Sequence, residues 1–532
     1  WTAQASYDQL SPAQIINHHV QACPELDGHE IYIRHGSCQV KGPSDLNSEG
    51  EFSKVDDIED LSQYAIRDIC GFISKNLFSL PSLEVHWDFS SARLRPLPSE
   101  NYAEAIRLGL EKKVCTNFKE QQYIPACDLE VFLDVSVARN LLDQDASVNM
   151  SHFETARFLR KVQTFPARKL LVLCVFSRFN LDELKHLIDH GFNDETRPQP
   201  STTCGDKECT AKYAQLRNNI HTFFPRNIKK GQKRHMLTTQ EVVPLQHPPC
   251  EERELGQGAY GVVTQVIIDR SHYSFPGDPD CRFALKTFAS NDLATAAFLS
   301  EVSMLDVLTP HGHDHIAGHI TAWSQADQHF ILYPKAAHNL RSYMTDVEPP
   351  ALRQPVMMWF FKQLGGLADA IDHVHRIKDG SEDGAVIEGC HHDIKPENIL
   401  VFERVPNKDP TFKIADFGAG HFYAGPNDDK RSKQYSKTGG TETYFAPDWE
   451  RHGNVSKSFD MWALGCVFLE LHLWLFRFHW DDGAGFSTKR AEFSGADPRN
   501  SEDRFWVKTK AGYVLKPAVE RVLEELEAKC NK

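Results

Sequence analysis

Three glycines near the middle of the chain have a spacing that suits contact with phosphate groups. In LGQGAYGVVTQV, which begins at Leu255, Gly256, Gly258 and Gly261 follow the pattern G-x-G-x-x-G, and Val263 comes two residues later. Such glycines let two strands turn tightly and bring backbone N–H groups against phosphate oxygens. Alone the pattern is weak, because a glycine-rich hairpin without a ligand has the same sequence.

A lysine further along the chain requires a negatively charged partner. Lys286 lies in FALKTF, an apolar run typical of a buried strand. An ammonium group without a counter-charge is costly in a low-dielectric environment. Glu301, in the helical stretch LATAAFLSEVSML, is the expected partner, because Asp292 is the one other acidic residue before Leu305.

Two further motifs complete an ordered set. CHHDIKPENIL contains Asp393, Lys395 and Asn398 in the spacing D-x-K-x-x-N, and IADFGAG contains Asp416. GTETYFAP and SFDMWALGC follow in that order. Together these motifs resemble the catalytic domain of eukaryotic protein kinases from Glu251 to at least Leu475. The ordered set is much more specific than any one motif.

The resemblance implies ATP and Mg²⁺ as cofactors. It implies that Lys286 clamps the α- and β-phosphates while Glu301 orients it, and that Asp416 and Asn398 hold the metal ion. The glycine-rich loop and Val263 would bind the nucleotide. Phosphoryl transfer depends on positioning and on electrostatic stabilisation, which explains why charged residues dominate the set.

The resemblance also assigns the residues on the substrate side. Asp393 would accept the proton of the substrate hydroxyl, and Lys395 would neutralise the γ-phosphate. Lys395 in D-I-K-P-E-N is similar to the serine/threonine type of catalytic loop. Thr441 in GTETYFAP fits that type, since its hydroxyl would contact the catalytic aspartate. A protein substrate with a serine or threonine acceptor follows.

The adenine site is expected in HFILYPKAAHNL. The strand Phe330 to Leu332 would place Tyr333 at the back of the nucleotide pocket and Pro334 to Ala336 in the hinge. Pro334 has no N–H, but its carbonyl can accept a hydrogen bond from adenine. The N–H of Ala336 would then donate to the base.

Two positions depart from the family pattern. His392 stands where an arginine usually precedes the catalytic aspartate, so the cation that binds an activation-loop phosphate is missing. We therefore expect activity that is largely independent of loop phosphorylation. Asp448 stands where the family usually has glutamate, which puts a buried ion pair to a distant arginine in doubt.

Composition and charge limit the class of protein. The 532 residues carry a net charge of -14, which argues against a nucleic-acid partner. Thirteen cysteines spread over the chain indicate a reducing compartment, cytoplasmic or nuclear. Met461 to Phe476 contains Glu470 and His472 and predicts a buried helix rather than a membrane span. The start lacks Met and a signal peptide, which suggests a fragment.

The pattern along the chain predicts three parts. Residues 1–192 are expected to form a mainly α-helical domain of unknown role, because apolar residues recur at helical spacing and Asn180 with Glu183 forms a capping box. Residues 193–249 hold six prolines and predict a linker, with a basic run that we interpret as solvated. Residues 250–532 are expected to form the kinase, its C-terminal end short. Such extensions resemble those ahead of kinases in filamentous fungi.

The predicted fold class is α+β, with a five-stranded antiparallel small lobe and a mostly helical large lobe. The predicted function is ATP-dependent phosphorylation of protein serine or threonine. Two alternatives stay open: a pseudokinase scaffold, and an N-terminal module that binds a regulatory protein partner and controls the kinase. Two small clusters, namely His311, His313 and His315, and Cys204 with Cys209, are interpreted as structural rather than metal-binding.

Overall fold

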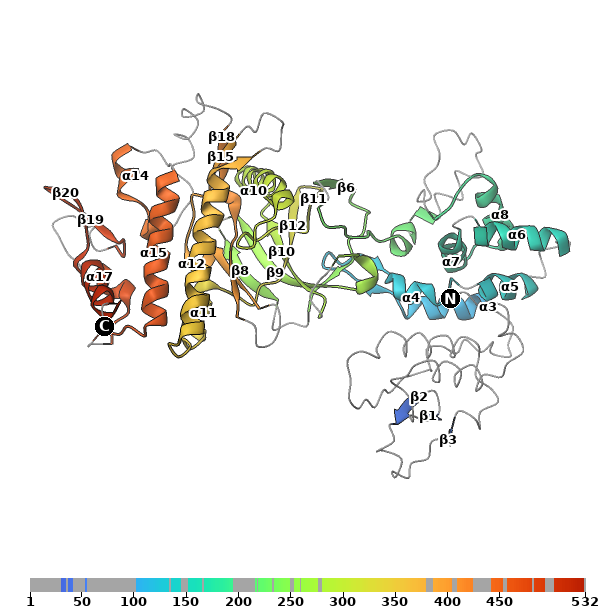
Figure 1. The fold of residues 1–532 in the computed structure, drawn as a ribbon. Helices are drawn as coiled ribbons and strands as arrows, with labels where there is room; N and C mark the ends of the chain where they lie inside the picture. Colours follow the sequence, from blue (N-terminus) through green and yellow to red (C-terminus); the bar gives the residue numbers. More distant parts are fainter. Residues whose placement is uncertain are drawn as a thin grey trace. The chain divides into compact units, whose positions relative to one another are not determined.

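The computed structural model forms two compact units (Figure 1), which are considered separately. One unit comprises Trp1–Glu111 with Glu130–Thr196, and the other comprises Lys112–Leu129 with Arg197–Lys532. The structure describes residues 30–34, 37–41, 53–54, 102–133, 135–144, 152–164, 167–194, 216–217, 219–231, 234–248, 253–258, 260–275, 280–378, 386–403, 409–423, 442–452, 457–480, 483–492 and 502–530. Thr441, Cys204 and Cys209 lie outside these residues.

The first unit is mainly helical where it is described. Its helices are α3 (Tyr102–Glu111), α5 (Val135–Gln144), α6 (His152–Thr164), α7 (Arg168–Phe176) and α8 (Leu181–Asp189). The apolar run 170–176 lies in α7 and is almost wholly buried, since these seven residues are apolar on all sides of the helix. The expected capping box of Asn180 and Glu183 is confirmed at the start of α8. Strands β1 (Glu30–Arg34), β2 (Ser37–Lys41) and β3 (Ser53–Lys54) form a small antiparallel sheet.

The second unit contains a seven-stranded sheet. Its members are β6 (His235–Leu237), β7 (Leu245–Gln246), β8 (Glu254–Gly258), β9 (Gly261–Ile268), β10 (Arg282–Phe288), β11 (Thr321–Gln325) and β12 (Gln328–Pro334). The strands lie in the order β6-β11-β12-β10-β9-β7, and β8 also pairs with β9. Strands β8 to β12 are the expected five antiparallel strands. The expected number was too low, because β6 adds in parallel to β11 and β7 adds antiparallel to β9.

The expected boundaries at 192 and 249 differ from the observed units. Strands β6 and β7 come from the predicted linker, and β4 (Cys115–Thr116), β5 (Gln122–Tyr123) and the start of α4 (Ala126–Glu130) also belong to the second unit. Val243 and Leu245 are buried against the sheet. Phe118 donates its N–H to the carbonyl of Leu245, and its ring packs edge-on against Phe330. These apolar contacts fold a proline-rich segment that local pattern assigns to a linker.

The large lobe is mostly helical. Helices α11 (Leu340–Asp346), α12 (Gln354–His375) and α15 (Lys457–Leu475) pack against two small sheets, and α12 and α15 run side by side (Figure 1). One sheet contains β13 (His338–Asn339), β16 (Ile399–Phe402) and β17 (Thr411–Ile414), and the other contains β14 (Ile377–Lys378), β15 (Val386–Cys390) and β18 (His421–Tyr423). The C-terminal part contains α14 (Pro447–His452), α16 (Phe486–Ala491), β19 (Trp506–Thr509), β20 (Gly512–Leu515) and α17 (Pro517–Cys530).

Helices α10 (Asp292–His311) and α15 are long and apolar enough to cross a membrane by length and composition alone. Both contribute residues to the apolar core of the second unit, including Phe298 of α10 and Val467 of α15. Each also buries a carboxylate, Glu301 in α10 and Asp460 in α15. Both helices therefore have the features of core helices.

Candidate active site

The expected partner of Lys286 is confirmed by the structure. The Nζ atom of Lys286 in β10 lies 2.7 Å from Oε2 of Glu301 in α10. It also lies 2.7 Å from Oδ1 of Asp416, which follows β17. A strand, a helix and a loop thus bring together three charged residues that are far apart in the sequence.

Burial and charge act in opposite directions in this cluster. Burial alone would lower the pKa of Lys286, but the carboxylates of Asp416 and Glu301 raise it overall. Burial would raise the pKa of Asp416, but the Lys286 ammonium lowers it overall. Lys286 is therefore a cation and Asp416 an anion at neutral pH. The two charges have the signs needed to hold phosphate and metal.

The glycine-rich segment lies on the neighbouring strand. Val263 of β9 is the cross-strand partner of Lys286, and Gly258 pairs with Gly261 at the turn between β8 and β9. A Cβ atom on Gly261 would lie 2.1 Å from the carbonyl oxygen of Thr287. Only glycine fits this close approach of two strands. Gly256 lies in β8 next to Val263.

The catalytic loop forms a second polar cluster. Oδ2 of Asp393 accepts from Nζ of Lys395 at 2.8 Å and from Nδ2 of Asn398 at 2.8 Å. Nδ2 of Asn398 also donates to the backbone carbonyl of Asp393. The structure thus brings together the three residues of the D-x-K-x-x-N motif. These contacts fix the orientation of the Asp393 carboxylate.

The backbone of the catalytic loop is bound by a buried carboxylate that the sequence analysis did not single out. Asp460 in α15 accepts hydrogen bonds from the backbone N–H groups of His391 and His392 and from Nε2 of His375. Asp460 is fully buried, and its pKa is low despite burial because of these donors. The aspartate in SFDMWALGC was the available signal, since an acidic residue inside an apolar helix needs partners.

Asn398 and Asp416 offer suitable oxygen donors for Mg²⁺. The N–H of Ala415 donates to the carbonyl of Asn398 at 2.8 Å, which places Asp416 beside Asn398. Because Nδ2 of Asn398 is bound to Asp393, its amide oxygen is left as an acceptor. Carboxylate and amide oxygens are ligands that Mg²⁺ accepts. The residues present therefore fit a magnesium ion.

Three further residues are expected at the site: Tyr333, Ala336 and Thr441. Tyr333 lies at the site. Its hydroxyl donates a hydrogen bond to Oε1 of Glu301, which the sequence analysis did not predict. Ala336 follows the end of β12, and the N–H of the next residue, Ala337, is already bound to Val401. Thr441 lies outside the described residues, so its contact with Asp393 stays a prediction.

The histidine turn before β11 is fixed by hydrogen bonds. Nδ1 of His315 donates to the carbonyl of Phe412, and Nδ1 of His313 accepts from the backbone N–H of His315. Nε2 of His313 lies 3.0 Å from Asp369. These bonds agree with a structural role.

His375, Cys390 and Asp460 also lie close enough together to hold a metal ion, but the oxygens of Asp460 already accept three hydrogen bonds.

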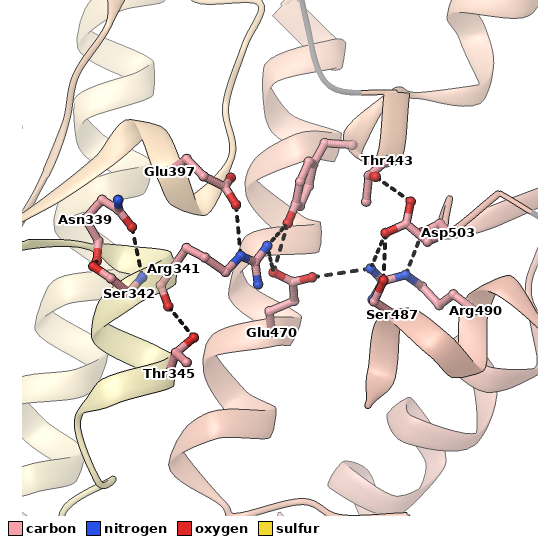
Figure 2. A network of polar contacts seen from close by, with 11 residues as sticks. Asn339, Arg341, Ser342, Thr345, Glu397, Thr443, Glu470, Ser487, Arg490 and Asp503 are labelled. Carbon is pink, nitrogen blue, oxygen red and sulfur yellow. Dashed lines mark hydrogen bonds and ion pairs between the residues drawn. The ribbon is translucent and has the colours of Figure 1, made fainter. Parts of the chain in front are cut away.

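Figure 2 shows an ion-pair network beside the catalytic loop. Arg341 of α11 contacts Glu397 of the loop and Glu470 of α15, and Arg490 of α16 lies 3.5 Å from the other oxygen of Glu470. A separate ion pair concerns the segment of Asp448, where the sequence put a buried ion pair to a distant arginine in doubt. Glu450, two residues later, lies 3.4 Å from NH1 of Arg504. A carboxylate from this segment thus does pair with a buried arginine.

Comparison with known proteins identifies part of the second unit. Residues 250–501 match the protein kinase domain family. The chain is 26% identical over 241 residues to cyclin-dependent kinase 2 of Caenorhabditis elegans and 27% identical over 226 residues to cyclin-dependent kinase 4 of Mus musculus, which is 44% and 41% of this chain. It is 40% identical over 77 residues, 14% of this chain, to calcium/calmodulin-dependent protein kinase type I of Schizosaccharomyces pombe.

Residues 250–501 therefore form a protein kinase catalytic domain, with a β-sheet small lobe and a mostly helical large lobe. The matched stretches cover 56%, 65% and 21% of the lengths of these three relatives. The chain thus spans only part of each relative. The activity of the whole chain is a proposal.

Proposed function

We propose that the chain transfers the γ-phosphate of Mg²⁺-bound ATP to serine or threonine hydroxyls of protein substrates. The observation that carries the proposal is that Lys286, Glu301 and Asp416 form one ion-pair cluster while Asp393, Lys395 and Asn398 form another. The two clusters are joined through the bond from Ala415 to Asn398. Phosphoryl transfer needs this combination of phosphate clamp, metal ligands and base.

Each residue has a separate task in the proposed reaction. Lys286 binds the phosphates of ATP, and Asp393 accepts the proton of the attacking hydroxyl. Lys395, 2.8 Å from Asp393, lies where it can balance negative charge on the transferred group. A magnesium ion held by Asp416 and Asn398 would neutralise charge on the phosphates.

The serine/threonine assignment rests on Lys395 and Thr441 and on two sets of relatives. The similar proteins include cyclin-dependent and calcium/calmodulin-dependent kinases. The test is incubation of the purified full chain with labelled ATP, Mg²⁺ and a mixture of unfolded protein substrates, followed by phosphoamino-acid analysis. We expect label on serine and threonine. Label on tyrosine alone would contradict the specificity, and nucleotide binding without transfer would favour the scaffold alternative.

A further inference from the structure

The buried carboxylate of Glu301 has a donor on each of its oxygens. Oε2 accepts from Nζ of Lys286 at 2.7 Å, and Oε1 accepts from the hydroxyl of Tyr333 at 2.5 Å. Only 1% of the Glu301 side chain is exposed. A carboxylate held at both oxygens cannot rotate without breaking one bond, and a broken bond here would leave a buried charged oxygen unpaired.

The sheet places the tyrosine hydroxyl against α10. Tyr333 of β12 is the cross-strand partner of Ala284, and Lys286 lies two residues after Ala284 on β10. Cross-strand partners and residues two apart on one strand share a face of the sheet. Tyr333 and Lys286 therefore point to the same side, toward Glu301. The ring of Tyr333 packs against the core of the unit, which fixes the position of the hydroxyl.

We propose that Tyr333 is a positioning residue for phosphoryl transfer, which acts on Lys286 through Glu301. The inference rests on the proposed function. By holding Oε1, Tyr333 directs Oε2 toward Lys286 and keeps the ammonium group where ATP phosphates are expected. The expected role of Tyr333 at the back of the nucleotide pocket is thus extended, because its hydroxyl supports the phosphate clamp rather than the adenine base.

The other groups that face Glu301 are consistent with this role. Asp416 shares Lys286 with Glu301, so Lys286 is pulled from two sides. A Cβ atom on Gly418 would lie 3.4 Å from Oε2 of Glu301, so this glycine leaves room for the carboxylate. Ser300, the residue before Glu301 in α10, donates to the carbonyl of Gly420. Ser300 fixes the helix, and Tyr333 fixes the carboxylate that the helix carries.

A double-mutant cycle tests the inference on the full chain with Tyr333→Phe, Glu301→Ala and the double variant. The phenylalanine ring keeps the packing and removes only the hydroxyl. We expect Tyr333→Phe to lower kcat/KM for ATP about tenfold, the range for one buried charge-assisted hydrogen bond. In the Glu301→Ala background the same change should cost less than twofold, because the group on which Tyr333 acts is gone.

The control is Tyr343→Phe on α11, where the ring packs against Phe412 and Trp474 and no contact of the tyrosine with Lys286, Glu301 or Asp416 is found among the described residues. It should change kcat/KM less than twofold. The affinity for Mg²⁺-bound ATP should show the same lack of additivity. It is measured by titration for the wild type, Tyr333→Phe, Glu301→Ala and the double variant. Equal losses from Tyr333→Phe with and without Glu301, or no loss at all, would overturn the role of Tyr333.

The two proposals fail separately. If the wild-type chain binds ATP but transfers no phosphate, the proposed function is wrong, and the affinity cycle alone decides whether Tyr333 acts through Glu301. If it transfers phosphate and the cycle is additive, only the role of Tyr333 is wrong. A chain that binds no ATP overturns both.

Discussion

His392 is bound to Asp460 through its backbone and not through its imidazole ring. The N–H of His392 donates to Oδ1 of Asp460 at 2.7 Å. Neither ring nitrogen makes a hydrogen bond to any residue that the structure describes, and the ring is buried beside Phe459 and His421. Burial lowers the pKa of His392 to about 4. His392 is therefore neutral at pH 7 and cannot replace a phosphate-binding arginine.

The first prediction concerns regulation. Ser432, Tyr435, Ser436 and Thr438 lie between Asp416 and Asp448, outside the described residues. A phosphate in this segment would order it by pairing with a fixed cation, and a neutral buried imidazole is not such a cation. We expect activity before and after complete phosphatase treatment to agree within threefold. A drop of more than about tenfold that follows loss of phosphate from Thr438 or its neighbours would show that another cation does this work.

The second prediction concerns acid stability. The folded-state pKa of His392 of about 4 lies below the unfolded value of ~6.5, so the unfolded chain binds the proton first as pH falls. The stability that His392 contributes is therefore fully present above about pH 6.5, and it is lost as the pH falls toward 4. Between pH 7 and pH 5 this group alone should remove about 2 kcal/mol from the free energy of unfolding.

The variant His392→Asn removes the titrating group and suits the left-handed backbone at φ 66°. Denaturant unfolding at pH 7 and pH 5 should show a smaller acid loss for this variant than for the wild type. The exposed His479→Asn is the control and should behave as the wild type. Equal acid losses for all three proteins would exclude His392 as the source.

The third prediction concerns the phosphate clamp. Lys286→Ala removes the cation between Glu301 and Asp416, and so should raise KM for ATP roughly tenfold or more, because the clamp acts in the ground state and the transition state alike. Steady-state kinetics with varied ATP measures this. Lys362→Ala, an exposed lysine on α12, should leave KM unchanged. Unchanged nucleotide affinity in Lys286→Ala would remove Lys286 from the site.

The fourth prediction concerns the segment that packs on the small lobe. Phe118 is partly buried and contacts Phe330 and His247 edge-on. Phe118→Ala should lower the free energy of unfolding by about 2 kcal/mol, less than for a fully buried ring. Chemical denaturation measures the change, with the exposed Phe361→Ala as the control at under ~0.5 kcal/mol. Equal stability of both variants would contradict integration of this segment into the small lobe.

The sequence predicts which charged residues lie together better than it predicts the boundaries of their unit. The pairing of Lys286 with Glu301 is predictable because a buried ammonium group needs a counter-charge. Strands β6 and β7 are not predictable, since each is three residues or fewer, and β7 lies between Pro244 and Pro248. Such short strands carry no periodic signal, and they form because β9 and β11 offer free edges.

The contact between Tyr333 and Glu301 shows a second limit. Each residue could be placed on its element from pattern, the tyrosine on a strand and the glutamate on a helix. Their hydrogen bond depends on the strand register, Tyr333 opposite Ala284, and on the rotation of α10. Register is decided by packing across the whole sheet, so a local pattern cannot predict it.

The most direct test of the account is the effect of Asp393→Asn on turnover and on ATP affinity. The substitution keeps the shape of the side chain and removes its capacity to accept the proton of the substrate hydroxyl. With labelled ATP and a protein substrate, we expect turnover to fall ~10² to 10⁴-fold while the dissociation constant for Mg²⁺-bound ATP changes less than threefold. Unchanged turnover, or an equal loss of turnover and nucleotide affinity, would contradict Asp393 as the catalytic base.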